Sequence, residues 1–472
     1  MVTPTPARKI IPIAPAQVSL YESQQKIYPR SVSGLYARWR WALVALTQLV
    51  FYGLPWLEWG QRQAVLFDLA SRRFYIFGLV LYPQDFIYLT GLLVISALSL
   101  FLFTAVAGRL WCGFACPQTV YTEIFLWIER QVEGDRSARM RLDAAPASVR
   151  KIARKSTKHA LWIGLALWTG FTFVGYFTPI RLLWGEAFTL SFGPWEWFWV
   201  NFYALATYGN AGFMREQVCK YMCPYARFQS AMFDKDTLIV SYDEGRGEPR
   251  GARSRQADPG TLGLGSCVDC TLCVQVCPTG IDIRQGLQYE CIGCAACVDV
   301  CDTVMDKMNY PRGLIRFTTQ NAVRQGWSSR QIVRRVLRPR VLIYGAVLAA
   351  LSAVVLGSLV MRTPLKVDVV RDRASLSRIV EGGRLENVYR LQIMNATERP
   401  VVYRIGATGL EGLAVASEPE VAVGPAESRW VAVRLQIPYG SATPGSHPIH
   451  FGVGALQGSD HVSEKSVFLV PR

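Results

Sequence analysis

The chain has 472 residues, a formal net charge of +16, 51% apolar residues and a mean hydropathy of +0.18. Such apolarity with an excess of Lys and Arg is typical of a membrane protein. It argues against a nucleic-acid-binding protein, because the basic residues flank apolar segments rather than forming one stripe. All twelve Cys lie between positions 112 and 301, whereas a secreted disulfide scaffold would spread them through the fold.

Residues 1–40 predict a mobile cytoplasmic tail. The stretch is basic and rich in Pro, and no apolar core follows its first charges. It therefore lacks the features of a secretory signal peptide.

Five apolar segments predict transmembrane helices, because a helix needs roughly 20 apolar residues to cross a bilayer. They cover 41–58, 86–108, 159–178, 195–214 and 341–361, and the first four form a predicted membrane region over 41–235. Residues 1–40, 130–158 and 324–340 carry an excess of Lys and Arg, whereas 58–85 and 178–194 are balanced. Positive loops stay inside, so the N-terminus and the Cys-rich region are predicted to be cytoplasmic and the chain after 361 to be outside.

Two similar Cys motifs follow the second and fourth predicted helices, at the cytoplasmic edge of the membrane. Each reads C-x3-C-P, with Cys112 and Cys116 in the first and Cys219 and Cys223 in the second. In a helix this spacing places both thiols on one face, so two pairs could enclose one centre. Soft thiolates favour Cu(I), zinc or an iron–sulfur cluster, with Met214 and Met222 close by. The alternative is four buried structural thiols.

Residues 236–340 predict a cytoplasmic ferredoxin-like domain with two 4Fe–4S clusters. Two C-x2-C-x2-C-x3-C runs occur in tandem, and in two-cluster ferredoxins the fourth Cys of each run binds the other cluster. The predicted ligands are Cys267, Cys270, Cys273 and Cys301 for the first cluster, and Cys291, Cys294, Cys297 and Cys277 for the second. Repeated C-x2-C also binds zinc, but two complete runs favour clusters. Asp302 stands where a Pro would follow the last Cys, which leaves the ligand set intact.

Residues 364–472 predict an immunoglobulin-like β-sandwich outside the membrane, after a fifth transmembrane helix over 341–361. Short alternating apolar runs recur between turn signals, and the length of roughly 100 residues is typical of such a module. The segment contains no Cys, so it has no Cys-based copper site.

Other redox cofactors find no support in the sequence. No G-x-G-x-x-G follows a strand, and only His159 lies near a predicted transmembrane helix. Neither a dinucleotide site nor a haem held by paired His is predicted. The electron donor is therefore a separate, unknown molecule, and no catalytic side chain is identified.

These motifs together resemble the cytochrome c oxidase accessory proteins of the CcoG family, also called FixG or RdxA. The resemblance covers nearly the whole chain and is carried by KIYPRSVSG from position 26, WCGFACPQTV from 111 and the block over 215–251. The tandem ferredoxin motif and the C-terminal sandwich complete it. The block and the outer domain separate this family from NapH-like and NosR-like membrane ferredoxins.

The resemblance implies a multi-pass protein of the bacterial inner membrane that supports assembly of a cbb-type oxidase. It implies reduction of Cu(II) to Cu(I), with the oxidase and copper-delivery proteins as partners. Soft Cys and Met carriers hold Cu(I) well, and an iron–sulfur cluster can supply the electron. Two alternatives are an electron-transfer subunit of a quinol-linked respiratory complex and a non-catalytic scaffold for oxidase assembly.

Overall fold

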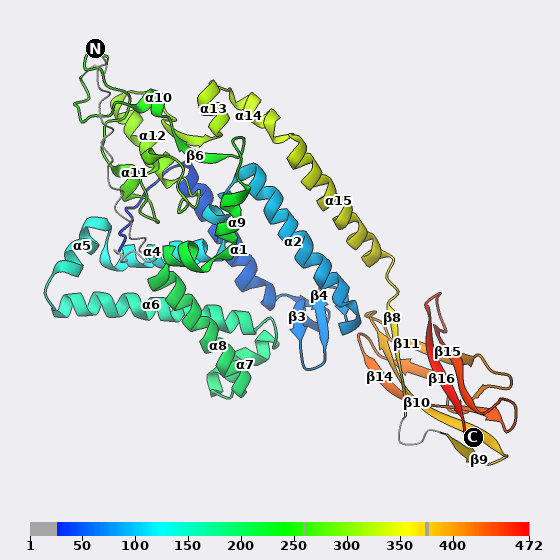
Figure 1. Cartoon of the computed structure of the whole chain (residues 1–472). Coiled ribbons are helices and arrows are strands. Elements are labelled where there is room, and N and C mark those ends of the chain that lie inside the picture. The colour runs from blue at the N-terminus through cyan, green and yellow to red at the C-terminus, as the bar shows by residue number, and fades with distance from the viewer. Residues whose placement is uncertain (1–25, 258–259, 373–376, 472) are drawn as a thin grey trace, which may run out of the picture.

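The computed structural model describes residues 26–257, 260–372 and 377–471. A helical body and a β-sandwich lie at opposite ends of an elongated molecule, and the helices α2 (Phe86–Ala107) and α15 (Pro339–Val360) run side by side between them (Figure 1). The predicted tail falls partly outside this description, since residues 1–25 are not included.

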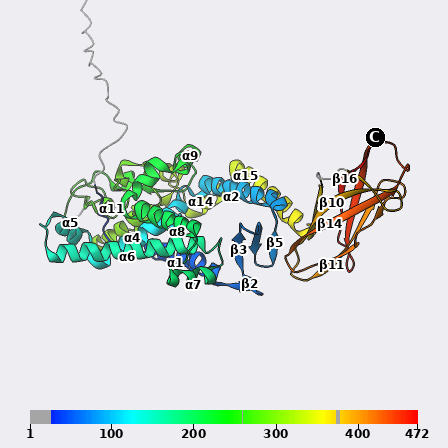
Figure 2. The same ribbon diagram turned by 90° about the horizontal axis from the view of Figure 1, so that it is seen from below.

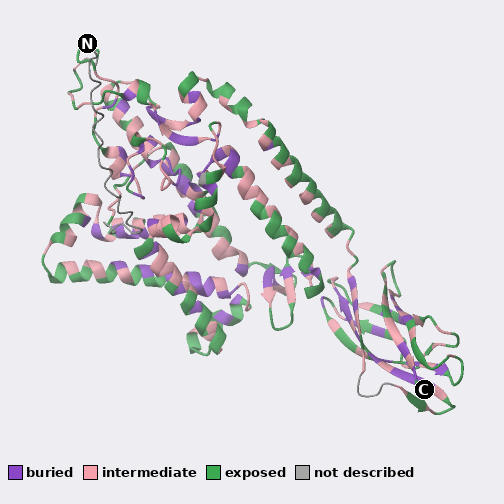
Figure 3. Ribbon diagram, viewed as in Figure 1, coloured by how far each residue is buried: buried purple, intermediate pink, exposed green. Residues whose placement is uncertain are grey.

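Helices occur at all five positions predicted to cross the membrane. They are α1 (Leu35–Gly53), α2, α6 (Val149–Val174), α8 (Pro194–Thr207) and α15. Among the described residues, two helices are long and apolar enough to span a bilayer, Pro83–Ala107 with mean hydropathy 2.3 and Pro339–Val360 with 2.2. Both expose most of their surface in the chain itself, as Figure 3 shows for α15. A membrane protein is supported, while a five-helix bundle stays a prediction.

The third and fourth helices differ from their predicted bounds. The first half of α6 is basic and begins ten residues before the predicted span, at Val149. The fourth helix changes to a π-helical segment, η3 (Tyr208–Met214), which contains Gly209 and Gly212. Helices α6 and α8 pack closely, because a Cβ at Gly170 would lie 2.2 Å from the Val200 carbonyl oxygen. The short helix α7 (Ile180–Thr189) connects them.

The segment between α1 and α2 forms small sheets that lie against the β-sandwich. Its elements are η1 (Leu54–Trp56), β1 (Glu58–Trp59), β2 (Arg62–Gln63), β3 (Val65–Asp68), β4 (Arg73–Ile76), β5 (Leu79–Leu81) and η2 (Pro83–Asp85). The Tyr82 hydroxyl donates to the carbonyls of Asn395 and Glu427 at 3.1 and 3.3 Å. Arg362 pairs with buried Asp85 at 3.0 Å. The loop predicted to lie outside and the C-terminal domain therefore share one end of the molecule, as Figure 2 also shows.

The C-terminal domain is a two-layer β-sandwich, which confirms the predicted immunoglobulin-like fold. One sheet contains β12 (Ala414–Val415), β14 (Ser428–Pro438), β10 (Arg384–Asn395), β8 (Leu365–Arg371) and β9 (Arg378–Val380). The other contains β13 (Glu420–Val423), β11 (Val401–Thr408), β15 (Gly445–Ala455) and β16 (His461–Val470). Alternate residues of β14, such as Val433, Leu435 and Ile437, are fully buried, as a strand with one face on a core requires.

The Cys-rich part of the chain gathers at the other end of the molecule. It comprises α3 (Leu110–Phe114), α4 (Pro117–Glu133), α5 (Arg136–Ala144), η4 (Val218–Met222), α9 (Pro224–Met232), β6 (Ile239–Tyr242), α10 (Glu244–Gly247), α11 (Leu272–Gln275), η5 (Ile283–Gln285), α12 (Ala296–Met308), β7 (Ile315–Thr318), α13 (Gln320–Gln325) and α14 (Ser329–Val336). Strands β6 and β7 pair antiparallel.

Residues 26–34 are held in place, so the prediction of a mobile tail is wrong for this part. Tyr28 donates from its hydroxyl to Asp143 at 2.7 Å, Lys26 pairs with the same carboxylate at 2.5 Å, and the Arg30 amide donates to the Gln275 carbonyl at 2.8 Å. This segment, called the strap below, connects α5 to the ferredoxin-like region. It ends where Asp299 of α12 accepts from the first amides of α1, at 3.2 and 2.7 Å.

Trypsin should report whether the strap is attached, because Lys26 and Arg30 are cleavage sites within it. Asp143→Asn should speed cleavage there by about tenfold, since charged hydrogen bonds contribute more than neutral ones. Burial raises the pKa of Asp143, but hydrogen bonds from Lys155, Lys26 and Tyr28 outweigh it and lower the pKa below its ordinary 3.8.

The sign of the pH dependence follows from that lowered pKa. A lowered carboxyl pKa stabilises the attached strap at every pH above the ordinary value, and this stabilisation is lost only as the pH falls below about 4. Cleavage of the unchanged protein should therefore keep the same slow rate, relative to a peptide standard, from pH 7 to 8.5. Equal cleavage of Asp143→Asn and of the exposed control Asp306→Asn would contradict the attachment.

Candidate metal centres

The two C-x2-C-x2-C-x3-C runs have matching local structures. In each run a helix begins just before the third Cys, α11 for Cys273 and α12 for Cys297. The residue that precedes each helix has left-handed backbone, Thr271 with φ 56° and Ala295 with φ 57°. This turn folds each loop back on itself, so the loop wraps one side of a cavity.

The first cavity is lined by Cys267, Cys270, Cys273 and Cys301. Cys301 comes from α12, whereas Cys267 and Cys270 come from the first loop and Cys273 from α11, which follows that loop. Burial, followed by repulsion from Cys273 and Cys267, raises the pKa of the Cys301 thiol to about 12. Cys270 is exposed, so this cavity lies near the surface.

The second cavity is lined by Cys277, Cys291, Cys294 and Cys297, and also reaches Cys273 of the first. Burial, followed by repulsion from Cys294 and Cys277, raises the pKa of Cys291 to about 12, although a hydrogen bond from the Gly293 amide acts in the opposite direction. Both predicted sets are thus brought together with the fourth Cys exchanged between runs. Neighbouring cavities that share Cys273 suit transfer from one centre to the other.

Asp302, the residue that departs from the usual pattern, is explained by α12. The helix continues past Cys301 to Met308, and Pro inside a helix would remove a backbone hydrogen bond. The Asp302 carboxylate instead accepts from the Gly313 amide at 2.9 Å.

The two complete Cys runs supply the ligands that a pair of cubanes needs. Each cubane takes four thiolates, and each thiolate binds a different iron. All twelve Cys are free of disulfides, as metal ligation requires.

The four Cys at the membrane edge also converge, although not on helix faces. Cys112 lies in α3 and Cys219 in η4, whereas Cys116 and Cys223 each precede a new helix that begins with Pro. Neither motif is one continuous helix, so its two thiols do not share a helix face. The reason is that the residue before a Pro at the first helical position favours an extended backbone. Burial, followed by repulsion from Cys116 and Cys112, raises the pKa of Cys219 to about 12.

The first membrane-edge motif contacts the second ferredoxin loop directly, through its backbone at Gly113. A Cβ at Gly113 would lie 2.8 Å from the Cα and N atoms of Cys294, so only Gly allows this approach. On the facing loop, Gly293 has φ 67° and its absent Cβ would lie 3.2 Å from the Arg109 carbonyl. Cys112 and Cys219 pack against the same buried cluster as Cys294.

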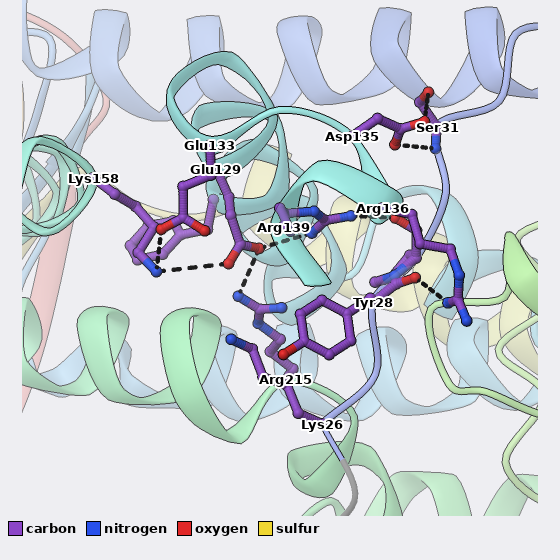
Figure 4. Close-up of polar contacts among 12 residues, drawn as sticks. Lys26, Tyr28, Ser31, Glu129, Glu133, Asp135, Arg136, Arg139, Lys158 and Arg215 are labelled. Carbon is purple, nitrogen blue, oxygen red and sulfur yellow. Dashed lines mark hydrogen bonds and ion pairs between the residues drawn. The ribbon is translucent and has the colours of Figure 1, made fainter. Parts of the chain in front are cut away.

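A buried ionic network fixes the segment that carries Cys219. Glu129, which is 1% exposed, accepts from Arg139 at 3.0 Å and from Arg215 at 3.1 Å, and Lys158 lies 3.7 Å away (Figure 4). Burial raises the pKa of the Glu129 carboxyl, but the charges of Arg215, Arg139 and Lys158 outweigh it and lower the pKa. Arg215 stands four residues before Cys219, so α4 and α6 together position the second motif.

Comparisons with known proteins agree with this architecture. A family model described as a 4Fe–4S dicluster domain matches residues 214–320, and one described as a 4Fe–4S binding domain matches residues 89–133. A third, described as the IG-like fold at the C-terminal of FixG, putative oxidoreductase, matches residues 355–471. The nitrogen fixation protein FixG of Rhizobium meliloti is 39% identical over 407 residues, covering 80% of this chain and 78% of that protein. The chain belongs to the FixG/RdxA family.

A second relative supports the same assignment. Protein RdxB of Cereibacter sphaeroides is 39% identical over 438 residues, which are 91% of this FixG/RdxA-family chain and 92% of RdxB. The crystal structure of a FixG-related protein from Vibrio parahaemolyticus covers 23% of the chain and 97% of that protein, with 22% identity and a TM-score of 0.22. The predicted family is confirmed, and with it an iron–sulfur protein of electron transfer.

Sequence reasoning missed the residues that join the centres of this family member. Gly113 lies inside the first C-x3-C-P motif and Arg109 three residues before it, and neither is a metal-ligand type that the motif itself would indicate. The sequence does show an Arg before each Cys pair, Arg109 before the first and Arg215 before the second. Arg109 donates to the Cys291 carbonyl, whereas Arg215 pairs with Glu129. Which partner each one reaches depends on contacts across more than 80 residues.

Proposed function

We propose that this chain passes electrons from a cytoplasmic donor through two 4Fe–4S clusters to copper at the membrane edge, and so reduces Cu(II) to Cu(I). The observation that carries the proposal is the contact of the membrane-edge motif with the second ferredoxin loop, at Gly113 and Cys294. A carrier that only bound copper would not need its thiols beside a redox centre.

The first cluster would be held by Cys267, Cys270, Cys273 and Cys301, and the second by Cys291, Cys294, Cys297 and Cys277. When bound, such clusters exchange one electron at a time. Exposed Cys270 makes the first set the one that a donor protein can approach. The second set lies between the first and the membrane edge, so the cysteines define an order of transfer.

Copper would be bound by Cys112, Cys116, Cys219 and Cys223. Each Cu(II) takes one electron and becomes Cu(I), and one cluster loses that electron. Four closely placed thiols favour the product, because Cu(I) prefers soft sulfur ligands. The raised pKa values of Cys112, Cys116 and Cys219 mean that metal binding must displace protons, as is usual for thiolate sites.

The family supports a proposal for the cellular setting. We place the chain in the bacterial inner membrane with five membrane-spanning helices, the ferredoxin-like domain in the cytoplasm and the β-sandwich in the periplasm. The partners are a cbb-type cytochrome oxidase under assembly and the proteins that deliver its copper. The shared end of residues 58–85 and the sandwich supports this topology.

A single-turnover experiment tests the proposal. Protein purified without oxygen is reduced with dithionite, freed of excess reductant and mixed with Cu(II) and a Cu(I)-specific chelator. We expect about two Cu(I) per chain as both clusters are oxidised, since each gives one electron. Clusters that remain reduced, or iron-free protein that forms Cu(I) equally fast, would contradict a reductase and leave a scaffold for oxidase assembly. Oxidation of an added quinol in the same assay would favour the quinol-linked alternative.

A further inference from the structure

Arg109 lies buried at the junction of the two kinds of centre. It is 7% exposed and stands at the start of α3, three residues before Cys112. One guanidinium nitrogen donates to the carbonyls of Tyr289 and Cys291, the latter at 3.4 Å, and the other donates to the Ala226 carbonyl at 2.5 Å. The side chain thus joins α3, the second ferredoxin loop and α9.

No carboxylate pairs with Arg109 among the described residues. The comparable arginine beside the first set, Arg284, pairs with Asp282 at 2.7 Å and with Asp269 at 2.5 Å. A second arginine near Cys294, Arg40, has Glu123 at 3.6 Å. The Nε atom of Arg109 is buried and has no hydrogen-bond partner in the described part of the chain. A buried charge without a counter-ion is strongly unfavourable, so this guanidinium requires an anion.

Thiols of both centres surround this charge. Burial raises the pKa of the Cys112 thiol to about 11 and that of the Cys291 thiol to about 12. The charge of Arg109 acts in the opposite direction on both pKa values. Thiolates bound to metal would supply the negative charge that the arginine lacks.

We propose that Arg109 is the shared counter-cation of the second cluster and the membrane-edge thiols, and that it raises the reduction potential of the second cluster above that of the first. This rests on the proposed function. Each electron adds a negative charge to its cluster, and a nearby unpaired cation stabilises that reduced form. The cation beside the first cluster is neutralised by two aspartates, so electrons move toward the membrane edge. Arg109 is a positioning residue, since it contacts the backbone of a ligand rather than the reacting atoms.

The test is an EPR-monitored redox titration of the full-length protein in detergent, comparing the unchanged chain with Arg109→Gln, Arg109→Lys and Arg312→Gln. Arg312 is an exposed arginine, 68% accessible, that pairs with Asp306, so its replacement removes the same formal charge from a position screened by solvent. At a fixed applied potential, Arg109→Gln should lower the ratio of reduced to oxidised second cluster about tenfold. This corresponds to a midpoint potential lowered by about 59 mV for a one-electron couple. The midpoint potential of the first cluster should not change. Arg109→Lys should give the second cluster the same midpoint potential as in the unchanged protein.

The outcomes separate this proposal from the one on which it rests. An unchanged protein without about eight irons and two cluster signals would overturn the proposed function. Two clusters with midpoints unmoved by Arg109→Gln, or moved equally by Arg312→Gln, would overturn the role of Arg109 alone. Loss of iron in both Arg109→Gln and Arg109→Lys would show that the side chain holds the loop together instead of setting the potential.

Discussion

Replacing one thiol from each membrane-edge motif, Cys112→Ala with Cys219→Ala, should abolish copper binding and slow Cu(II) reduction at least tenfold. Cu(I) sites depend on soft sulfur ligands, and this variant removes two of the four thiols that converge there. The ferredoxin set is untouched, so the iron content should stay at about eight per chain. Anaerobic metal quantification with EPR, alongside the chelator assay, measures both quantities on one sample.

A matched variant controls for damage to this segment. Lys220→Ala changes a residue between Cys219 and Cys223 in η4 and keeps all four thiols, so copper and reduction should be preserved. Iron that falls from about twelve to about eight in the double variant would mean a third cluster at the membrane edge. In that case the copper site would lie elsewhere. Full reduction by the double variant would remove these thiols from the route.

The Cys that line each of the two cavities could be predicted from the sequence because their determinants are local. Three thiols of each group lie within seven residues, and the exchange of the fourth is expected from the tandem spacing. The sandwich could be predicted for the same reason. Apolar and polar residues alternate along the second half of β14, and its buried positions alternate in the same way. The pairing of Cys219 with Cys112 was predicted from the repeat, and the structure brings these thiols together.

The contacts that hold the Cys-rich segments against one another could not be predicted, because they join distant parts of the chain. Arg109 and Cys291 are 182 residues apart, and Asp299 accepts from the start of α1 across 262 residues. Gly34 is required at the second contact, where a Cβ would lie 2.3 Å from the Asp299 carboxyl carbon. A sequence shows that such residues are present but not which surface each one meets.

Removing either exchanged ligand, Cys301→Ala or Cys277→Ala, should leave one cluster with about four irons per chain. If ligation is exchanged between the runs, Cys301→Ala loses the first cluster, although Cys301 follows Cys291, Cys294 and Cys297 in sequence. The cavity lined by Cys301 with Cys267, Cys270 and Cys273 is the basis for this expectation. Iron analysis and EPR give the number of clusters that remain.

Arg109→Gln then identifies the cluster that remains in each variant. The Arg109 guanidinium reaches the loop of Cys291 and not that of Cys267. Its replacement should therefore lower the midpoint potential of the cluster left in Cys301→Ala but not that of the cluster left in Cys277→Ala. The opposite result would mean that each run binds its own cluster. Reduction of Cu(II) should also differ, because only the variant that keeps the second cluster retains a centre in contact with the membrane-edge thiols. Cys301→Ala, reduced directly by dithionite, should therefore still form about one Cu(I) per chain, while Cys277→Ala should form it at least tenfold more slowly.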